Sequence, residues 1–89
     1  MKAHVVISGF VQGVGYRHFI RSNAQKLGLT GWVANVPDGK VEVLFQGPKE
    51  KIEEVILLCR KGPFLAEVED VDVEWEEIEE SFSDFKIIS

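Results

Sequence analysis

The sequence has few basic residues, one cysteine and no long apolar run. It contains 10 Lys and Arg residues against 15 Asp and Glu residues, for a formal net charge of −5. A protein that binds nucleic-acid phosphates needs a basic face, so this balance argues against a nucleic-acid partner. No apolar run reaches bilayer-spanning length, which argues against a membrane partner. The single Cys59 cannot form an internal disulfide and the N-terminus lacks the pattern of a secretory signal, so we expect a cytoplasmic protein.

Several common kinds of active site are also missing from the sequence. No cluster of His, Cys, Asp and Glu has the spacing of metal ligands, so we expect no metal and no other cofactor. The sequence offers no His and Cys pair that could act as a nucleophile with its base. A Cys-x5-Arg phosphatase loop starting at Cys59 is also excluded, because the position of its arginine is Leu65. Any chemistry must therefore use other groups.

The 89 residues fit one domain, residues 1–89, with one core. Apolar spacing and turn residues predict the elements in this order: a strand over 3–8, a helix over 16–27, a hairpin over 31–46 with its turn at Pro37-Asp38-Gly39, a helix from Pro48 to Lys61, a strand over 71–75, an acidic loop over 76–81 and a short strand at Phe85 and Ile87. Val68 breaks the alternation of the strand over 71–75, which suggests a bulge or a later strand start. This order predicts an α+β fold, the ferredoxin-like βαββαβ sandwich, in which an antiparallel sheet carries two helices on one face, with a short C-terminal strand added.

Residues 9–17 form a glycine-rich corner between the first strand and the first helix. Such a corner points several backbone N–H groups at one spot, and helix N-termini favour anions. Arg17 places a cation in the first helical turn, where the helix dipole disfavours it, and a bound anion would remove that conflict. We therefore expect a phosphoryl-binding loop. His18 breaks the dinucleotide glycine pattern, and no Gly-Lys-Ser/Thr follows as in a nucleotide P-loop.

Five motifs, in order and spread over almost the whole chain, resemble the acylphosphatase family. They are Gly9-Phe10-Val11-Gln12-Gly13-Val14-Gly15-Tyr16-Arg17, Leu27-Gly28-Leu29-Thr30-Gly31-Trp32-Val33-Ala34-Asn35, Asp38-Gly39-Lys40-Val41-Glu42, Gln46-Gly47 and Gly62-Pro63. The resemblance implies a hydrolase that cleaves the carboxyl–phosphate bond of acyl phosphates, with Arg17 binding phosphate and Asn35 placing the attacking water. Two positions depart from the family pattern: Tyr16 replaces the usual phenylalanine, and the last turns of the second helix lack the family's frequent tryptophan.

The expected chemistry suits the residues that are present. A carboxylate leaves as a stable anion, so no strong general acid is needed, and positioning with charge stabilisation can suffice. We expect inorganic phosphate, the product, to be a competitive inhibitor, and we expect a monomer. One candidate for the base is the substrate's own phosphate. The phosphoryl oxygens would be held by the Arg17 guanidinium and by the backbone amides of Val11, Gln12, Gly13, Val14, Gly15 and Tyr16.

Plainer interpretations stand beside these. Arg17 could be a solvated helix residue, Asn35 a turn residue, and the two glycines Gly13 and Gly15 simple turn formers. His4 and His18 are expected outside the site, and Cys59, Trp32 and Trp75 in the core. A non-catalytic anion-binding or carrier-handling module is a second possible function, although the chain ends soon after its last strand, which favours the enzyme. An RNA-binding domain of similar fold is a third, but it would expose aromatic and basic residues on its middle strands.

Overall fold

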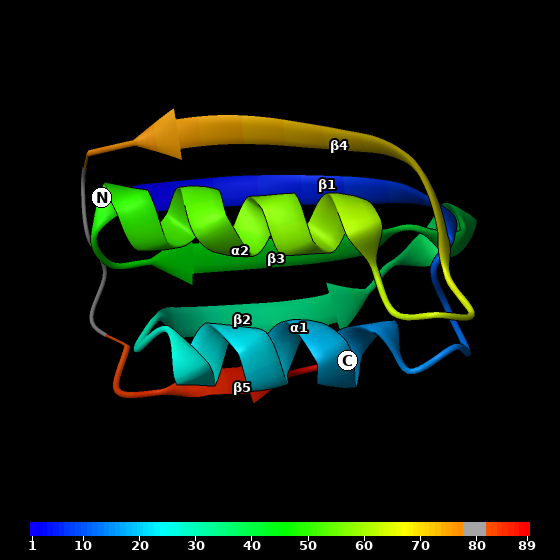
Figure 1. Ribbon diagram of the computed structural model, residues 1–89, viewed down its shortest axis with the longest axis horizontal. Coiled ribbons are helices and arrows are strands. Elements are labelled where there is room, and N and C mark those ends of the chain that lie inside the picture. The colour runs from blue at the N-terminus through cyan, green and yellow to red at the C-terminus, as the bar shows by residue number, and fades with distance from the viewer. Residues whose placement is uncertain (78–81) are drawn as a thin grey trace.

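Alternating apolar residues build one five-stranded sheet in the order β4-β1-β3-β2-β5 in this computed structural model, which describes residues 1–77 and 82–89 (Figure 1). β1 lies inside the sheet, as its apolar residues on both faces predict, with β3 on one side and β4 on the other. The strands are β1 (Lys2–Phe10), β2 (Thr30–Asn35), β3 (Val41–Gln46), β4 (Glu67–Glu76) and β5 (Phe85–Ile87).

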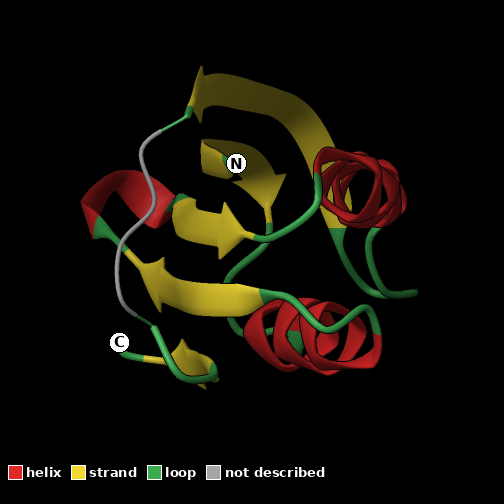
Figure 2. Cartoon of the chain, turned by 90° about the vertical axis from the view of Figure 1, so that its left-hand side faces the viewer, coloured by secondary structure: helices red, strands yellow, loops and turns green. Residues whose placement is uncertain are grey.

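Two helices, α1 (Tyr16–Lys26) and α2 (Lys49–Lys61), lie side by side on one face of this sheet (Figure 2). The second helix begins after Pro48 and ends at Gly62, whose φ of 69° is in the left-handed region that favours glycine. A short 3-10 turn, η1 (Pro37–Gly39), joins β2 to β3. No helix in the described part of the chain is long and apolar enough to span a membrane.

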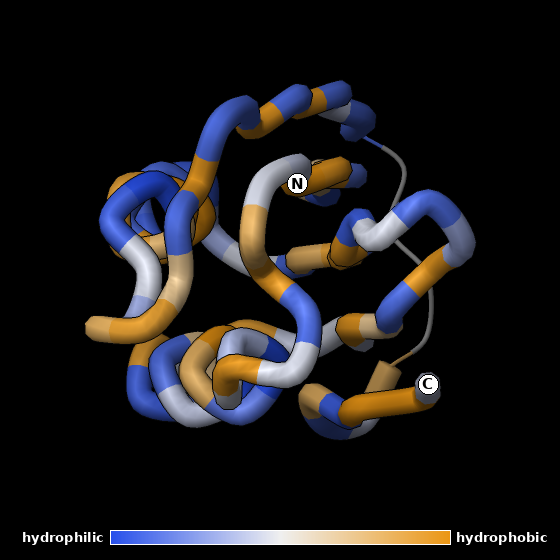
Figure 3. Tube along the Cα trace, turned by 90° about the vertical axis from the view of Figure 1, so that its right-hand side faces the viewer, coloured by the Kyte–Doolittle hydropathy of each residue, from blue (hydrophilic) through white to orange (hydrophobic). Residues whose placement is uncertain are grey.

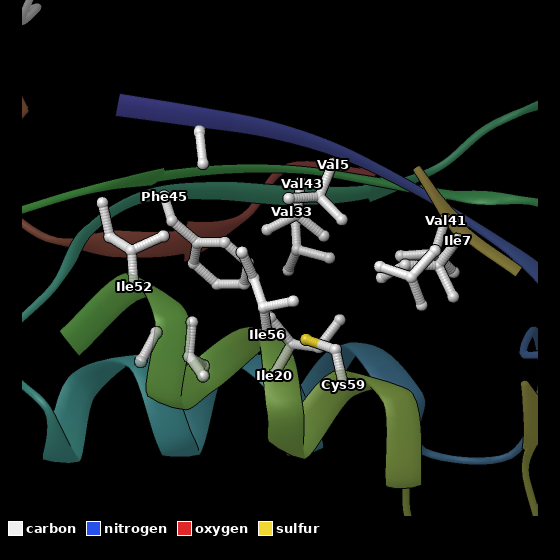
Figure 4. Packing of buried hydrophobic residues seen from close by; sticks show 14 of the residues in the cluster. Val5, Ile7, Ile20, Val33, Val41, Val43, Phe45, Ile52, Ile56 and Cys59 are labelled. Carbon is white, nitrogen blue, oxygen red and sulfur yellow. The ribbon is translucent and has the colours of Figure 1, made fainter. Parts of the chain in front are cut away.

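The core fills the space between the sheet and the two helices (Figure 4). Alternate residues of the three inner strands supply its upper layer, because successive strand side chains point to opposite faces. The helices supply the lower layer from residues spaced three and four apart. Its buried members include Val5, Ile7, Val33, Val41, Val43, Phe45, Ile20, Ile52, Ile56 and Cys59.

The predicted fold class is confirmed, with one addition to the sheet. β5 pairs with β2 in parallel, from Gly31 opposite Phe85 to Val33 opposite Ile87, so the sheet is mixed. The irregularity expected at Val68 is a bulge: Ser8 pairs with Asp70 while Gly9 pairs with Val68, which leaves an extra residue in β4.

Three details of the sequence-based prediction were wrong or fall outside the description. Trp75 is 37% exposed, because β4 is a sheet edge and its helix-facing side is only partly covered. Trp32 lies on the face away from the helices, opposite Leu44, with its ring edge against His4. Glu76 is the last residue of β4 and its carboxylate lies 3.3 Å from the Lys2 Nζ atom, so the acidic loop does not start there. Glu77 is an exposed bend residue, in agreement with a loop, and the last part of that expected loop, residues 78–81, lies outside the described residues.

Candidate active site

The C-terminal ends of β1 and β2 lie at the same end of the sheet, because both strands pair antiparallel with β3, which lies between them. The register places one row of side chains across four strands: Val71 opposite Ile7, Ile7 opposite Val41, and Val41 opposite Asn35. This row faces the helices, because Ile7 and Val41 are core residues. Asn35 is thus the polar end of an apolar row. β2 ends and α1 begins at the same end of the molecule (Figure 1), the end that faces the viewer in Figure 3.

The loop from Val11 to Gly15 leads from β1 into α1 with two left-handed glycines, at φ 74° for Gly13 and 77° for Gly15. Gly15 is the N-cap residue, and within the described residues no side chain caps this helix. The first helical hydrogen bond runs from the Phe19 N–H to the Gly15 carbonyl, 3.0 Å apart, so earlier N–H groups of the helix lack intrahelical partners. These amides are of the kind that bind an anion.

Arg17 lies in the first turn of α1 and is partly buried. Across residues 1–77 and 82–89, no hydrogen bond or ion pair holds its guanidinium. The first turn of α1 also contains no acidic residue. A cation beside unpartnered N–H groups adds positive charge to a helix end that is already positive, which favours a bound anion.

Asn35 is fixed through its backbone and open to a partner through its side chain. Its N–H donates to the Ser89 carbonyl at 2.9 Å, so the C-terminal segment after β5 runs beside it. Its side-chain Oδ1 is buried, and among the described residues no donor reaches that atom. A buried acceptor left unpaired costs about 1–3 kcal/mol, and groups of this kind occur at functional sites.

Gln12 connects the glycine loop to the turn after β2. Its Nε2 donates to the Val36 carbonyl at 2.9 Å and to the Lys40 carbonyl at 2.8 Å. Val36 directly follows Asn35, so this side chain joins the two parts of the candidate site. The sequence indicated a backbone role for Gln12 but gave no sign of this side-chain bridge, because the bond partners are carbonyls that any residue type would present.

Tyr16 anchors the start of α1 to the end of α2. Its hydroxyl donates to the Cys59 carbonyl at 2.6 Å, deep in the core, and its ring stacks near Phe19. Burial raises the pKa of the Tyr16 hydroxyl well above its usual range, and burial raises the pKa of the Cys59 thiol to about 12. Both groups are therefore neutral, and they serve packing and not acid–base chemistry.

The remaining candidates lie apart from the loop. His4 is on the open face of the sheet, where its Nε2 lies 2.7 Å from the Glu42 carboxylate. His18 is exposed on α1 and interacts with Arg21. In the described part of the chain, no group of three or more His, Cys, Asp and Glu side chains is arranged to hold a metal ion.

Val11 is buried, Val14 is partly buried, and Gly13 and Gly15 are exposed, so the loop is anchored at its start and open at its tip.

Comparisons with known proteins identify the family of the chain. The acylphosphatase family model matches residues 3–87. An acylphosphatase from Pelotomaculum thermopropionicum is 49% identical over 86 residues, which cover 97% of this chain and 94% of that protein. The crystal structure of an acylphosphatase from Bacillus subtilis superposes with a TM-score of 0.96 at 33% identity, covering 99% of this chain and 98% of that one.

A longer protein also contains this fold. Full-length HypF, in its phosphate- and nucleotide-bound form, matches with a TM-score of 0.89 and 34% identity over 99% of this chain but only 12% of its own length. The family model and the relatives of matching length are sufficient for an assignment. The chain belongs to the acylphosphatase family, hydrolases that act on acid anhydrides.

Proposed function

We propose that this protein hydrolyses the carboxyl–phosphate bond of acyl phosphates without a metal ion, using Arg17 and the loop amides to hold the phosphoryl group and Asn35 to place the water. The observation that carries the proposal is the buried Asn35 Oδ1, for which the described residues supply no donor. The Asn35 side chain lies on the helix-facing side of the sheet, at the strand ends beside which α1 begins with its uncapped N-terminus and Arg17.

The phosphoryl group is the part of the substrate that this site is equipped to recognise. The backbone N–H groups of Val11 to Tyr16 can donate to its oxygens, and the Arg17 guanidinium can donate two parallel hydrogen bonds. These donors also stabilise the charge on the equatorial oxygens during transfer. Gly13 and Gly15 leave space there, since the nearest described atoms are over 4 Å from where a Cβ would be at either position.

Water attack needs orientation more than a strong base. A water that donates one hydrogen to the Asn35 Oδ1 would keep its lone pair for the phosphorus, in line with the departing carboxylate oxygen. The carboxylate leaves without protonation, because it is a stable anion at neutral pH. The products are a carboxylate and inorganic phosphate, and phosphate should compete with substrate for the same loop.

A steady-state assay of the purified chain tests the proposal. Acetyl phosphate should be turned over, with inorganic phosphate as a competitive inhibitor, and a strong chelator should leave the rate unchanged. An alkyl phosphate ester is the matched control: it should bind and resist hydrolysis, because its alkoxide leaving group needs an acid that this site does not offer. Phosphate binding without any acetyl phosphate turnover would contradict the proposal and favour a non-catalytic anion-binding module.

A further inference from the structure

We propose that the Gln12 side chain is a positioning residue, which sets the place of Asn35 relative to the phosphate-binding loop. The inference rests on the proposed function and concerns the same site. It assigns to this side chain a role beyond that of the Gln12 backbone amide.

The Gln12 side chain connects the glycine-rich loop to the turn that follows β2. A side-chain amide nitrogen has two hydrogens, and Gln12 directs both at carbonyls of the turn that follows β2, those of Val36 and Lys40. The same turn closes on itself, because the Val36 N–H donates to the Lys40 carbonyl at 3.0 Å. Gln12 therefore binds a preformed pair of carbonyls, and both of its donors are used.

The turn that Gln12 holds has an unusual backbone. Asp38, which is not a glycine, has a φ of 75°, and Gly39 follows at 78°. The Gln12 side chain contacts one carbonyl on each side of these two residues, those of Val36 and Lys40. Asp tolerates the left-handed region better than most residue types, so the Asp38-Gly39 pair can keep the turn in the shape that Gln12 contacts.

This connection lies where a small displacement of Asn35 relative to the loop would affect the reaction. Gln12 is followed by Gly13 and preceded in the same segment by Gly9, and both have backbone angles that side chains rarely allow. On the other side, Asn35 is held through its N–H by the Ser89 carbonyl. Gln12 thus fixes the distance between a glycine-rich loop and the strand end that carries Asn35. A displacement of about 1 Å between reacting groups can lower a rate by roughly 100-fold.

The test is a substitution that keeps the size of the side chain and removes its donors. Gln12→Met should lower kcat by about 10- to 100-fold, because the water is misplaced. The dissociation constant of inorganic phosphate should change by less than about threefold, since the Gln12 backbone amide remains. Gln12→Asn, one methylene shorter, cannot span both carbonyls and should give the same result. Gln25→Met is the matched control, because among the described residues the Gln25 side chain makes only a long hydrogen bond of 3.5 Å, to the Phe85 carbonyl.

A double-mutant cycle separates positioning from general structural support. In the Asn35→Ala background, Gln12→Met should lower kcat by less than about twofold, because the residue it positions is already gone. A full additional loss in that background, or a wild-type kcat in Gln12→Met and Gln12→Asn, would overturn the inference. Absence of acetyl phosphate turnover in the wild-type chain would overturn the proposed function, and the positioning role with it.

Discussion

Asn35 combines a fixed backbone with a side chain that faces the helices at the end of an apolar row. An amide can donate and accept without changing its charge, so it can orient a water while leaving the phosphate-binding field almost intact. Asn35→Ala should lower kcat by about 100- to 1000-fold, the range seen when one well-placed hydrogen bond is lost. The dissociation constant of phosphate, measured by calorimetry, should change little.

Asn23→Ala is the control for that substitution, because Asn23 donates to the Phe19 carbonyl within α1 and has no proposed part in the reaction. Its kcat should match the wild type. If Asn35→Ala instead abolishes phosphate binding together with turnover, Asn35 is a binding or structural residue. An almost unchanged kcat would make it a turn residue.

Arg17 provides a second prediction for a single residue. Arg17→Lys keeps the charge and removes the planar two-pronged donor, so one charged hydrogen bond is lost. A bond of about 1.5–3 kcal/mol corresponds to a roughly 10- to 100-fold weaker binding of inorganic phosphate, and kcat should fall as well. Arg21→Lys is the control, since Arg21 contacts His18 on α1. Wild-type kinetics in Arg17→Lys would make Arg17 a solvated surface residue.

The junction of α1 with α2 should make the stability of the fold depend on pH in the alkaline range. Burial raises the pKa of the Cys59 thiol from 9.0 to about 12, and it raises that of the Tyr16 hydroxyl from 10.0 in the same direction. The folded protein therefore retains protons that the unfolded chain releases at alkaline pH. This stabilisation is fully present below pH 9 and is lost as the pH rises through the folded pKa values, by at most about 1.4 kcal/mol per pH unit for each group.

Urea unfolding between pH 8 and pH 11, spanning the unfolded-state pKa values of 9.0 and 10.0, measures this effect. The free energy of unfolding should decline above pH 9, and the decline should be shallower in Tyr16→Phe, which lacks one of the two groups. That variant should also be about 1 kcal/mol less stable at neutral pH, because the Cys59 carbonyl loses its donor. A constant free energy of unfolding up to pH 11 would show that the junction opens without unfolding.

The positions of the helices and strands were easier to predict from the sequence than the contacts between them. Period and turn residues locate both helices and all five strands, since those signals are local. Trp75 shows the limit: its alternation correctly places it on the helix-facing side, but exposure depends on whether β4 is an edge strand, which is a property of the assembled sheet. The Gln12 bridge and the bond between Asn35 and Ser89 are hidden for the same reason, because each joins residues far apart in the chain to backbone groups of no particular sequence.

The whole molecule presents one long edge strand, β4, with acidic side chains along it. Asp70, Asp72 and Glu74 are exposed on the face away from the helices, next to residues that face the α2 side. Pairing of two β4 strands would bring like charges together, which discourages association through this edge. We therefore expect a monomer at neutral pH, measurable by light scattering coupled to size-exclusion chromatography. A dimeric mass that persists in high salt would contradict this, and a dimer in the triple variant Asp70→Asn, Asp72→Asn, Glu74→Gln alone would support it.

The order of the strands also has a consequence for protein synthesis. All the proposed site residues belong to the first half of the chain, yet β1 and β2 are flanked by β4 and β5, and the Asn35 N–H is held by Ser89. Contacts between residues so far apart in the sequence form late, because the intervening chain must first be ordered. A nascent chain of residues 1–62 already contains β1, β2, β3 and the Gln12 bridge, but it lacks β4, β5 and the Ser89 carbonyl that holds the Asn35 N–H. We therefore expect the proposed site to be fully fixed only after β5 has left the ribosome.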